Sequence, residues 1–402
     1  MGAPSASTRT AAGAGSERPD LAAIVRAHGA VLQRTHRLAP VQRQALRAIE
    51  TCRTPALGGH LERCDHCGAT RAVYHSCRNR HCPRCSTLAQ ARWVEARQAE
   101  LLPIEYFHVV FTLPHALNPL AQRCPRLIYD LLFQCAADTL RTFARDPRHL
   151  GGELGITAVL HTWGQNLSQH VHLHCVVTGG ALAPDGSRWV AARKGFLFPV
   201  RALSKVFRGK YLAALQEASA RGQLPPEASG KDLLRALRGT PWVVYAKPPF
   251  GGPEQVLAYL GRYTHRIALS NERILALDDG IVHFRWRDYA DRNRSKVMAL
   301  PAEEFLRRFL LHVVPTGFQR IRHFGLLANR RRAQTLARCR TLLRQPPPPA
   351  PPLRETTPAL LRRLTGIDLT RCPICGEGRM GVVAELDKHD AIPARVAILD
   401  SS

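Results

Sequence analysis

The 402-residue sequence lacks any apolar run long enough to cross a bilayer. Its first residues, Met1–Pro19, are small and polar and have no hydrophobic core of the kind found in signal peptides. Acidic residues are scarce, because 31 Asp and Glu accompany 57 Lys and Arg and leave a formal net charge of +26. We therefore expect no membrane partner, a bacterial cytoplasmic location with nucleoid association when DNA is bound, and a polyanionic partner, most simply nucleic acid.

Twelve cysteines are present, and without a secretion signal they are more typical of zinc ligands or reduced thiols than of disulfides. Two C-x-x-C pairs, Cys64/Cys67 and Cys82/Cys85, flank a hairpin-like stretch at the spacing of a four-cysteine structural zinc site. Four unligated thiols in a loop-rich segment are the less favoured interpretation. A second zinc site could be formed by Cys52, His60, Cys77 and His81. Of these, Cys77 and His81 could instead support the first site or face DNA.

Basic residues accompany these cysteines and recur near the end of the chain. Arg78, Arg80 and Arg84 lie among the zinc ligands, where they could contact phosphates or form a solvated charged surface. Residues 318–340 are also very basic and suit either a nucleic-acid surface or a charged helix face. Beyond a proline run, Cys372/Cys375 form a lone C-x-x-C pair, which Cys339 or His389 could complete or which could bind no metal.

Histidines alternate with apolar residues over His170–His174, which predicts a strand with His170, His172 and His174 on one face and Val171, Leu173, Cys175 and Val177 on the other. Several imidazoles on one face suit a divalent metal. An upstream strand with a turn at Asn166–Gln169 would place Trp163 opposite His172 and His161 opposite His174, on the same face. His161 is therefore a third candidate ligand, and Gln165 is a weaker one.

A helix is predicted from Pro253 to about Arg266. At 100° per residue, Tyr259 clusters with Gln255, Arg262 and Arg266, and Tyr263 lies at the border of the apolar arc. Both hydroxyls then project beside arginines that can bind phosphate. An ordinary packing role is the alternative for each tyrosine. His265 could contact metal, phosphate or the core.

The remaining periodicities predict an α+β fold, an antiparallel sheet with helices packed on it, preceded by a small helical zinc-binding domain. The expected domains are 1–18 disordered, 19–102 zinc-binding and DNA-recognising, 103–342 catalytic, 343–353 proline-rich linker and 354–402 tail. Expected helices are Leu21–Arg34, Pro40–Arg53, Thr87–Leu102, Leu117–Arg145 with a kink at Pro125, Phe198–Arg221, Lys231–Arg238 and Ala302–His312. Expected strands are Ile104–Leu113, Gly155–Gln165, Trp242–Lys247, Ile267–Leu269, Arg273–Leu277, Ile281–Trp286 and Lys296–Leu300.

A metal held by histidines beside tyrosines suits phosphodiester cleavage, because a cation polarises the phosphate and a tyrosine can attack it and form a covalent link. Two tyrosines one helical turn apart would allow two successive transfers.

At these residues the chain resembles the HUH endonucleases, whose His–hydrophobic–His motif matches His172–His174. More narrowly it resembles the two-tyrosine rolling-circle transposases of the insertion-sequence-ninety-one type. The stretches that carry this resemblance are 54–60 (TPALGGH), 76–83 (SCRNRHCP), 110–114 (VFTLP), 161–165 (HTWGQ) and 259–266 (YLGRYTHR).

The resemblance implies an N-terminal zinc-binding domain and an HUH nuclease domain. It implies nicking and rejoining of single-stranded DNA at transposon ends and target, dependent on magnesium or manganese. Tyr259 and Tyr263 would form 5′-phosphotyrosine intermediates, His172 and His174 would be metal ligands, and His170 would lie outside the metal's ligand set. Host replication proteins are possible partners. The alternatives are an HUH replication initiator or relaxase, and a non-catalytic zinc DNA-binding protein.

Overall fold

The computed structural model describes residues 18–98, 100–225, 231–247, 255, 258, 261, 268–347 and 355–388. None of the helices within these ranges combines the length and the apolar character needed to cross a membrane. Several expectations fall outside them: the N-terminal 17 residues, most of the expected tyrosine helix and of the proline run, and the residues Tyr259, Arg262, Tyr263, His265, Arg266 and His389.

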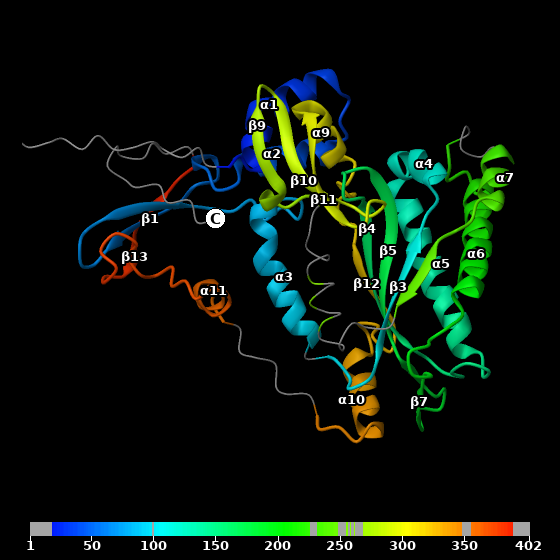
Figure 1. Cartoon of the computed structure of the whole chain (residues 1–402). Coiled ribbons are helices and arrows are strands. Elements are labelled where there is room, and N and C mark those ends of the chain that lie inside the picture. Colours follow the sequence, from blue (N-terminus) through cyan, green and yellow to red (C-terminus); the bar gives the residue numbers. More distant parts are fainter. Residues whose placement is uncertain are drawn as a thin grey trace, which may run out of the picture.

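A five-stranded antiparallel sheet lies at the centre of the molecule, in the strand order β12-β4-β5-β3-β8 (Figure 1). In that order the strands are β12 (Ile321–Gly325), β4 (Gly155–Trp163), β5 (Gln169–Thr178), β3 (Tyr106–Thr112) and β8 (Val244–Lys247). Successive side chains of a strand point to opposite faces. The apolar set on β5, Val171, Leu173, Cys175 and Val177, is buried in the main core, as the alternation predicts.

Helices cover the apolar face of this sheet (Figure 1). They are α4 (Asn118–Arg123), α5 (Pro125–Arg145), α6 (Val200–Ala220) and α7 (Lys231–Gly239), with the 3-10 turn η2 (His115–Leu117) before them. Aromatic rings join the two layers: Phe111 of β3 packs edge-on against Phe207 of α6, with ring centroids 4.9 Å apart. The helix expected over Leu117–Arg145 is divided at Cys124, because Pro125 has no N–H to continue the preceding helix and instead begins α5.

A second core joins the N-terminal helices to a segment late in the chain. Asp20 caps the first helix, since its Oδ1 accepts a hydrogen bond of 2.8 Å from the Ala23 N–H. The elements around this core are α1 (Leu21–Thr35), α2 (Pro40–Thr51), the sheet of β9 (Ile274–Asp278), β10 (Ile281–Asp288) and β11 (Arg294–Pro301), the 3-10 turn η4 (Asn271–Arg273) and α9 (Ala302–Leu310). The hydrophobic core therefore crosses the expected boundary between residues 102 and 103.

A small three-stranded sheet unites the two ends of the chain, in the order β13-β1-β2. Its strands are β1 (Gly59–Cys64), β2 (Thr70–Tyr74) and β13 (Met380–Leu386), preceded by the 3-10 turn η1 (Pro55–Leu57). Two helices connect this region with the rest: α3 (Pro83–Gln98), on the side of the central sheet opposite α5 and α6, and α11 (Thr357–Thr365) (Figure 1).

The remaining elements are the hairpin of β6 (Gly180–Leu182) and β7 (Trp189–Ala191) and the helix α10 (Arg332–Leu342), near the lower end of the central sheet (Figure 1). The predicted class, an α+β fold built on an antiparallel sheet, is confirmed. Two details were wrong. Ala268 and Leu269 do not form a strand, and β12, within the basic stretch, was not foreseen as an edge strand of the central sheet.

Candidate metal centres and active site

Three histidines gather on the face of the central sheet opposite the main core. His161 of β4 lies directly across from His172 of β5, and His174 follows two residues later on the same face. One ring nitrogen from each of the three lies within 4.8 Å of the others. We call this group the histidine cluster. It brings together the three residues that the sequence indicates as ligands of a catalytic metal.

Hydrogen bonds fix the orientation of two of these rings. The Nδ1 of His172 is 2.8 Å from the carbonyl oxygen of His170, and because a carbonyl can only accept, Nδ1 carries the proton and Nε2 is left as the metal-binding atom. The Nδ1 of His174 is 2.8 Å from Nε2 of His108 on β3, and the two rings are stacked. Partners of this kind orient metal-binding histidines in proteins. The sequence argument missed His108, although it alternates with Phe107 and Val109, which face the core.

Burial favours the neutral form of these imidazoles. Desolvation lowers the pKa of His172 to about 3 and keeps the pKa of His174 well below its ordinary value, and it lowers the pKa of His108 to about 4. A metal binds the neutral imidazole, so these rings need no deprotonation near neutral pH.

The register of the β4–β5 hairpin differs from the expected one. His161 pairs with His172, and Val159 pairs with His174, whereas the sequence argument placed each partner two residues later on β4. The reason is a turn over Gly164–Ser168, closed by a 2.9 Å hydrogen bond from Gly164 N–H to Ser168 C=O, together with a bulge between His161 and Trp163. A shift of two residues keeps a side chain on its face, so His161 still joins the cluster.

Two neighbouring candidates lie outside the histidine cluster. The ring of His170 contacts His115, with 3.1 Å between His115 Nε2 and His170 Nδ1. Gln165 donates a 3.2 Å hydrogen bond from Nε2 to the hydroxyl of Tyr289. The weaker ligand role considered for Gln165 stays a prediction.

The expected nucleophiles lie outside the described residues, but three positions of the expected helix are described, and each is helical: Gln255, Ala258 and Gly261. Gly261 is midway in sequence between the two tyrosines. It is buried against α3, where a Cβ added to it would overlap Cγ2 of Val94. Glycine is therefore needed for the close approach of this helix to α3.

A first group of cysteines, Cys52, Cys77, Cys82 and Cys85, surrounds the start of α3, and their sulfur atoms all lie within 4.8 Å of one another. Cys52 Sγ is 3.5 Å and Cys77 Sγ is 3.6 Å from Cys85 Sγ. We call this group the inner cysteine cluster. It contributes to the second core. Four thiolates at such distances fit a tetrahedral zinc ion, whose charge compensates theirs.

A second group, which we call the outer cysteine cluster, consists of Cys64, Cys67, Cys372 and Cys375. The expected site made of Cys64, Cys67, Cys82 and Cys85 is therefore wrong. Cys52 and Cys77 lie at the base of the β1–β2 hairpin and Cys64 lies at its tip. A strand of six residues separates base from tip by about 17 Å, so the two pairs cannot share one ion. The pair Cys372/Cys375 is not alone: it is grouped with Cys64 and Cys67, and not with Cys339, which is buried in another core.

The two histidines considered as zinc ligands belong to neither cysteine cluster. His60 contacts Glu62, with 3.2 Å between Nε2 and Oε1. His81 is buried, and its Nδ1 has no hydrogen-bond partner among the described residues. Desolvation lowers the pKa of His81 to about 3.

The arginines of the zinc module divide into exposed and internally bonded ones. Arg78 is exposed, whereas Arg80 donates to the carbonyl of Phe318 and Arg84 forms a 2.7 Å ion pair with Asp20. The later basic stretch divides in the same way. Arg330 and Arg331 are exposed. Other arginines of that stretch have intramolecular partners: Arg322 with Asp130, Arg332 with Glu100, Arg338 with Gly186 and Arg340 with Leu101.

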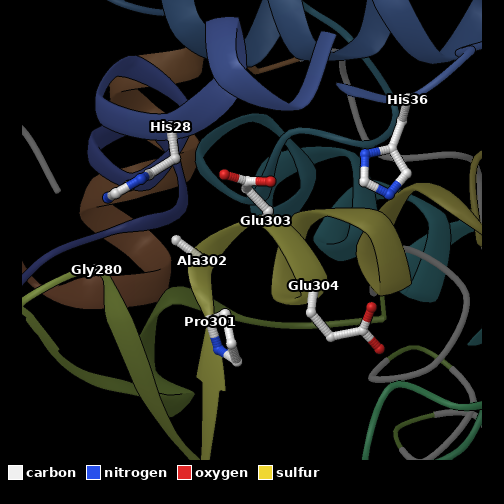
Figure 2. Close-up of a pocket in the computed structure, with 7 residues that line it drawn as sticks. All are labelled: His28, His36, Gly280, Pro301, Ala302, Glu303 and Glu304. Carbon is white, nitrogen blue, oxygen red and sulfur yellow. The ribbon is translucent and has the colours of Figure 1, made fainter. Parts of the chain in front are cut away.

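A pocket of about 480 Å³ between α1 and the start of α9 is a separate feature (Figure 2). His28 and His36 line one side, and Glu303 and Glu304 of α9 line the other. Glu304 is held by ion pairs with Arg307 and Arg308. The pocket includes no member of the three metal-ligating groups found among the described residues, so we do not assign the chemistry to it.

Two regions of the chain match models of known protein families. Residues 24–113 match the family model described as "Transposase zinc-binding domain", and residues 155–334 match the one described as "Putative transposase". The first range contains the inner cysteine cluster, and the second contains the histidine cluster. The pair Cys372/Cys375 lies outside both.

Two similar proteins are transposases. The chain is 51% identical to "Putative transposase y4qJ" of Sinorhizobium fredii over 383 residues, which cover 92% of this chain and 96% of that protein. It is 28% identical to the transposase for insertion sequence element IS801 of Pseudomonas savastanoi pv. phaseolicola, over 84% of this chain and 83% of that protein. A metal-bound structure of the conjugative relaxase TrwC with oriT DNA is similar at 14% identity and a TM-score of 0.24, over 40% of this chain and 71% of that one. From its sequence relatives, the chain belongs to the insertion-sequence-ninety-one (IS91) family of transposases.

Proposed function

We propose that this transposase nicks and rejoins single-stranded DNA at transposon ends and target sites through 5′-phosphotyrosine intermediates, during rolling-circle transposition. The observation that carries the proposal is the histidine cluster. Three largely buried imidazoles converge on the face of the sheet opposite the main core, and hydrogen bonds from the other ring nitrogen orient two of them. Sites placed on strands hold such geometry well.

The histidine cluster would hold one divalent ion, magnesium or manganese. When bound, this ion would act as a Lewis acid on a non-bridging phosphate oxygen. Manganese, a transition metal, accepts nitrogen ligands more readily than magnesium does, so it is the first ion to test. His161, His172 and His174 would supply the nitrogens, and His108 would keep the ring of His174 in place.

Tyr259 and Tyr263 would be the nucleophiles. In each transfer a tyrosine oxygen forms an ester with the 5′ phosphate, the bond from phosphorus to the 3′ oxygen breaks, and the tyrosine proton ends on the released 3′ hydroxyl. Rejoining reverses these steps with another 3′ hydroxyl. Gly261, which lies between the two tyrosines in the sequence, packs closely against Val94 of α3.

DNA affinity would come from distributed cations. Arg262 and Arg266 would contact phosphates near the tyrosines, and Arg78 would contact phosphate at the zinc module, because it is exposed there. Arg80 and Arg84 would act mainly within the protein, given their contacts to Phe318 and Asp20. In this scheme the protein works on the bacterial nucleoid, with host replication proteins supplying the displaced strand.

The experiment that tests the proposal uses single-stranded oligonucleotides carrying a transposon end, incubated with the protein and manganese or magnesium. We expect a covalent protein–DNA adduct whose nucleotide maps to Tyr259 or Tyr263. The double variant Tyr259→Phe/Tyr263→Phe should form no adduct, since phenylalanine keeps the ring and removes the hydroxyl. Tyr245→Phe is a matched control, because Tyr245 is a half-exposed tyrosine on β8, across Val110 from His174.

Three outcomes would argue against the proposal. An adduct on Tyr245 or another tyrosine would move the nucleophile. Binding of DNA without any metal-dependent nicking would favour the non-catalytic zinc DNA-binding protein. Nicking without strand transfer between two transposon ends would favour a replication initiator or relaxase.

A further inference from the structure

The two halves of the outer cysteine cluster have the same local structure. Each is a C-x-x-C-G knuckle, Cys64–Gly68 in the N-terminal module and Cys372–Gly376 in the tail. Both glycines adopt left-handed backbone angles, with φ of 72° and 71°. In each, the glycine N–H donates to the carbonyl of the first cysteine, at 3.1 Å and 3.0 Å. Two matching turns that face each other are the usual construction of a four-cysteine zinc site.

Distances between the sulfur atoms fit a metal ion. Cys67 Sγ is 3.7 Å from Cys372 Sγ, and Cys64 Sγ is 3.8 Å from Cys375 Sγ. A tetrahedron with zinc–sulfur bonds of about 2.3 Å has edges of about 3.8 Å, whereas a disulfide needs about 2.05 Å. Backbone N–H groups also point at the sulfurs, from Cys67 to Cys64 at 3.5 Å and from Gly378 to Cys375 at 3.4 Å.

The backbone of the tail is placed closely against the N-terminal knuckle. Asp65 N–H donates to the carbonyl of Arg379 at 3.0 Å, and Arg379 N–H donates to Asp65 Oδ1 at 2.7 Å. A side chain at Gly378 would overlap Cys64 Sγ, so only glycine permits this approach. From there β13 continues as the edge strand beside β1.

Apolar burial is too small to hold β13 by itself. All five residues between its ends are exposed, including Val382 at 57% and Val383 at 53%. A short exposed strand gains little from the hydrophobic effect, and ordering it costs conformational entropy. Something else must fix the tail to the module.

We propose that the outer cysteine cluster binds a structural zinc ion shared by the two ends of the chain, and that this ion holds the tail in place. Cys67 and Cys372 are 305 residues apart in the sequence, so the ion closes a loop around the whole catalytic region. It also keeps α11 beside α3, where Arg363 pairs with Glu95 at 2.6 Å and Arg92 donates to Thr357 at 3.3 Å. The proposal does not depend on the nuclease mechanism.

Metal content of the full-length protein is the first measurement. We expect two zinc ions per wild-type chain, one in each cysteine cluster, and one in the variant Cys372→Ser/Cys375→Ser. Cys124→Ser is the matched control, because this half-buried cysteine belongs to neither cluster, and it should keep two zinc ions. One zinc ion in both the wild type and the double variant would overturn the proposal.

Thiol labelling identifies which cysteines lose their ion. Cys67 is exposed, so without metal it should react freely with an alkylating reagent. In the wild type we expect Cys67 to be protected, and to react at least tenfold faster in Cys372→Ser/Cys375→Ser, while the inner cluster stays protected in both. Equal labelling of Cys67 in the two proteins, or a disulfide found in the untreated wild type, would contradict a shared zinc.

Hydrogen exchange then tests whether the outer zinc ion keeps β13 in place. The measurement uses only the wild type, so its result does not depend on how the variant folds. Removal of the outer zinc by a chelator should raise amide exchange throughout residues 380–386 while the central sheet remains protected. Unchanged exchange in these residues after loss of the ion would show that strand pairing alone holds the tail.

Discussion

The histidine cluster and the inner cysteine cluster border the same core, yet their ligand sets suit different tasks. Trp163 stacks on His161 with ring centroids 4.5 Å apart, and it also packs against the second core, which includes Cys52 and Cys82. The cysteine cluster offers four thiols, enough to close a tetrahedral shell. The histidine cluster offers three imidazoles and so leaves positions for a substrate oxygen or water. A closed shell suits a structural ion, and an open one suits catalysis.

The two clusters also differ in the structural elements that hold their ligands in place. The cysteines lie on the end of α2, on a loop and on the first turn of α3, so zinc itself contributes to holding these pieces together. The histidines lie on paired strands backed by the main core, and hydrogen bonds to His170 and His108 set their rings before any ion binds. On the proposed function, the inner cysteine cluster would need its ion to hold these pieces together, and the histidine cluster would need its ion only for the reaction.

The largest effect should come from the histidine cluster. His172→Ala and His174→Ala should each abolish nicking, because each removes a nitrogen from the metal, while DNA binding persists on distributed arginines. Oligonucleotide cleavage and electrophoretic mobility shifts measure the two properties. A mild chelator should likewise stop nicking and leave zinc in place, and manganese should restore it.

A control for this prediction exists on the same strand. His170→Ala removes a ring outside the cluster but keeps the backbone carbonyl that orients His172, so nicking should change little. If His170→Ala loses as much activity as His172→Ala, or if either cluster variant also loses its zinc, the division into a catalytic and a structural site is mistaken.

Much of the catalytic region could be predicted from the sequence, for a physical reason. Strict alternation over His170–His174 fixes which side chains share a face, and this conclusion survives a register error of two residues. The error itself came from the turn. Asn166 accepts from both the N–H and the hydroxyl of Ser168, and Leu167 adopts a positive φ, and such local choices are not visible in a hydrophobic pattern.

The zinc ligands could not be grouped from spacing alone, because C-x-x-C pairs identify half-sites and not their partners. The sequence argument placed the hairpin between the two C-x-x-C pairs. In the structure β1 and β2 form a hairpin with Cys64 and Cys67 at its tip, and Cys52 and Cys77 meet at its base. The pairing of Cys67 with Cys372, 305 residues later, has no local sequence pattern. It depends on how the intervening domain folds and brings the tail back to the N-terminal module.

A smaller effect is expected at the contact between Gly261 and α3, which would help to position the expected tyrosine helix. Gly261→Ala introduces a methyl group where Val94 already lies, so we expect the helix to shift and the rate of adduct formation to fall about 100-fold, the loss typical of a 1 Å misplacement. Zinc content and DNA affinity should not change.

Val94→Ala supplies the compensating change. On its own it should have little effect, and combined with Gly261→Ala it should recover most of the lost rate, because the second methyl then has room. Failure of the double variant to recover would mean that glycine is needed at position 261 for a reason other than contact with α3. Gly239→Ala is a control for the substitution itself, since a Cβ at Gly239 meets nothing within 4 Å.

The smallest loss of nicking activity should come from replacing His108, which contacts the ring of His174 but is not a member of the histidine cluster. For Nε2 of His174 to face the ion, Nδ1 must carry the proton and donate it to Nε2 of His108, so His108 acts as a positioning residue. His108→Ala should weaken manganese binding ten- to a hundredfold, the usual cost of losing such a partner, and raise the metal concentration for half-maximal nicking accordingly. At saturating manganese the rate should return close to that of the wild type. His108→Gln, whose side-chain carbonyl can accept the same hydrogen bond, should restore part of the affinity. A rate that stays low at every manganese concentration would instead give His108 a direct part in the reaction.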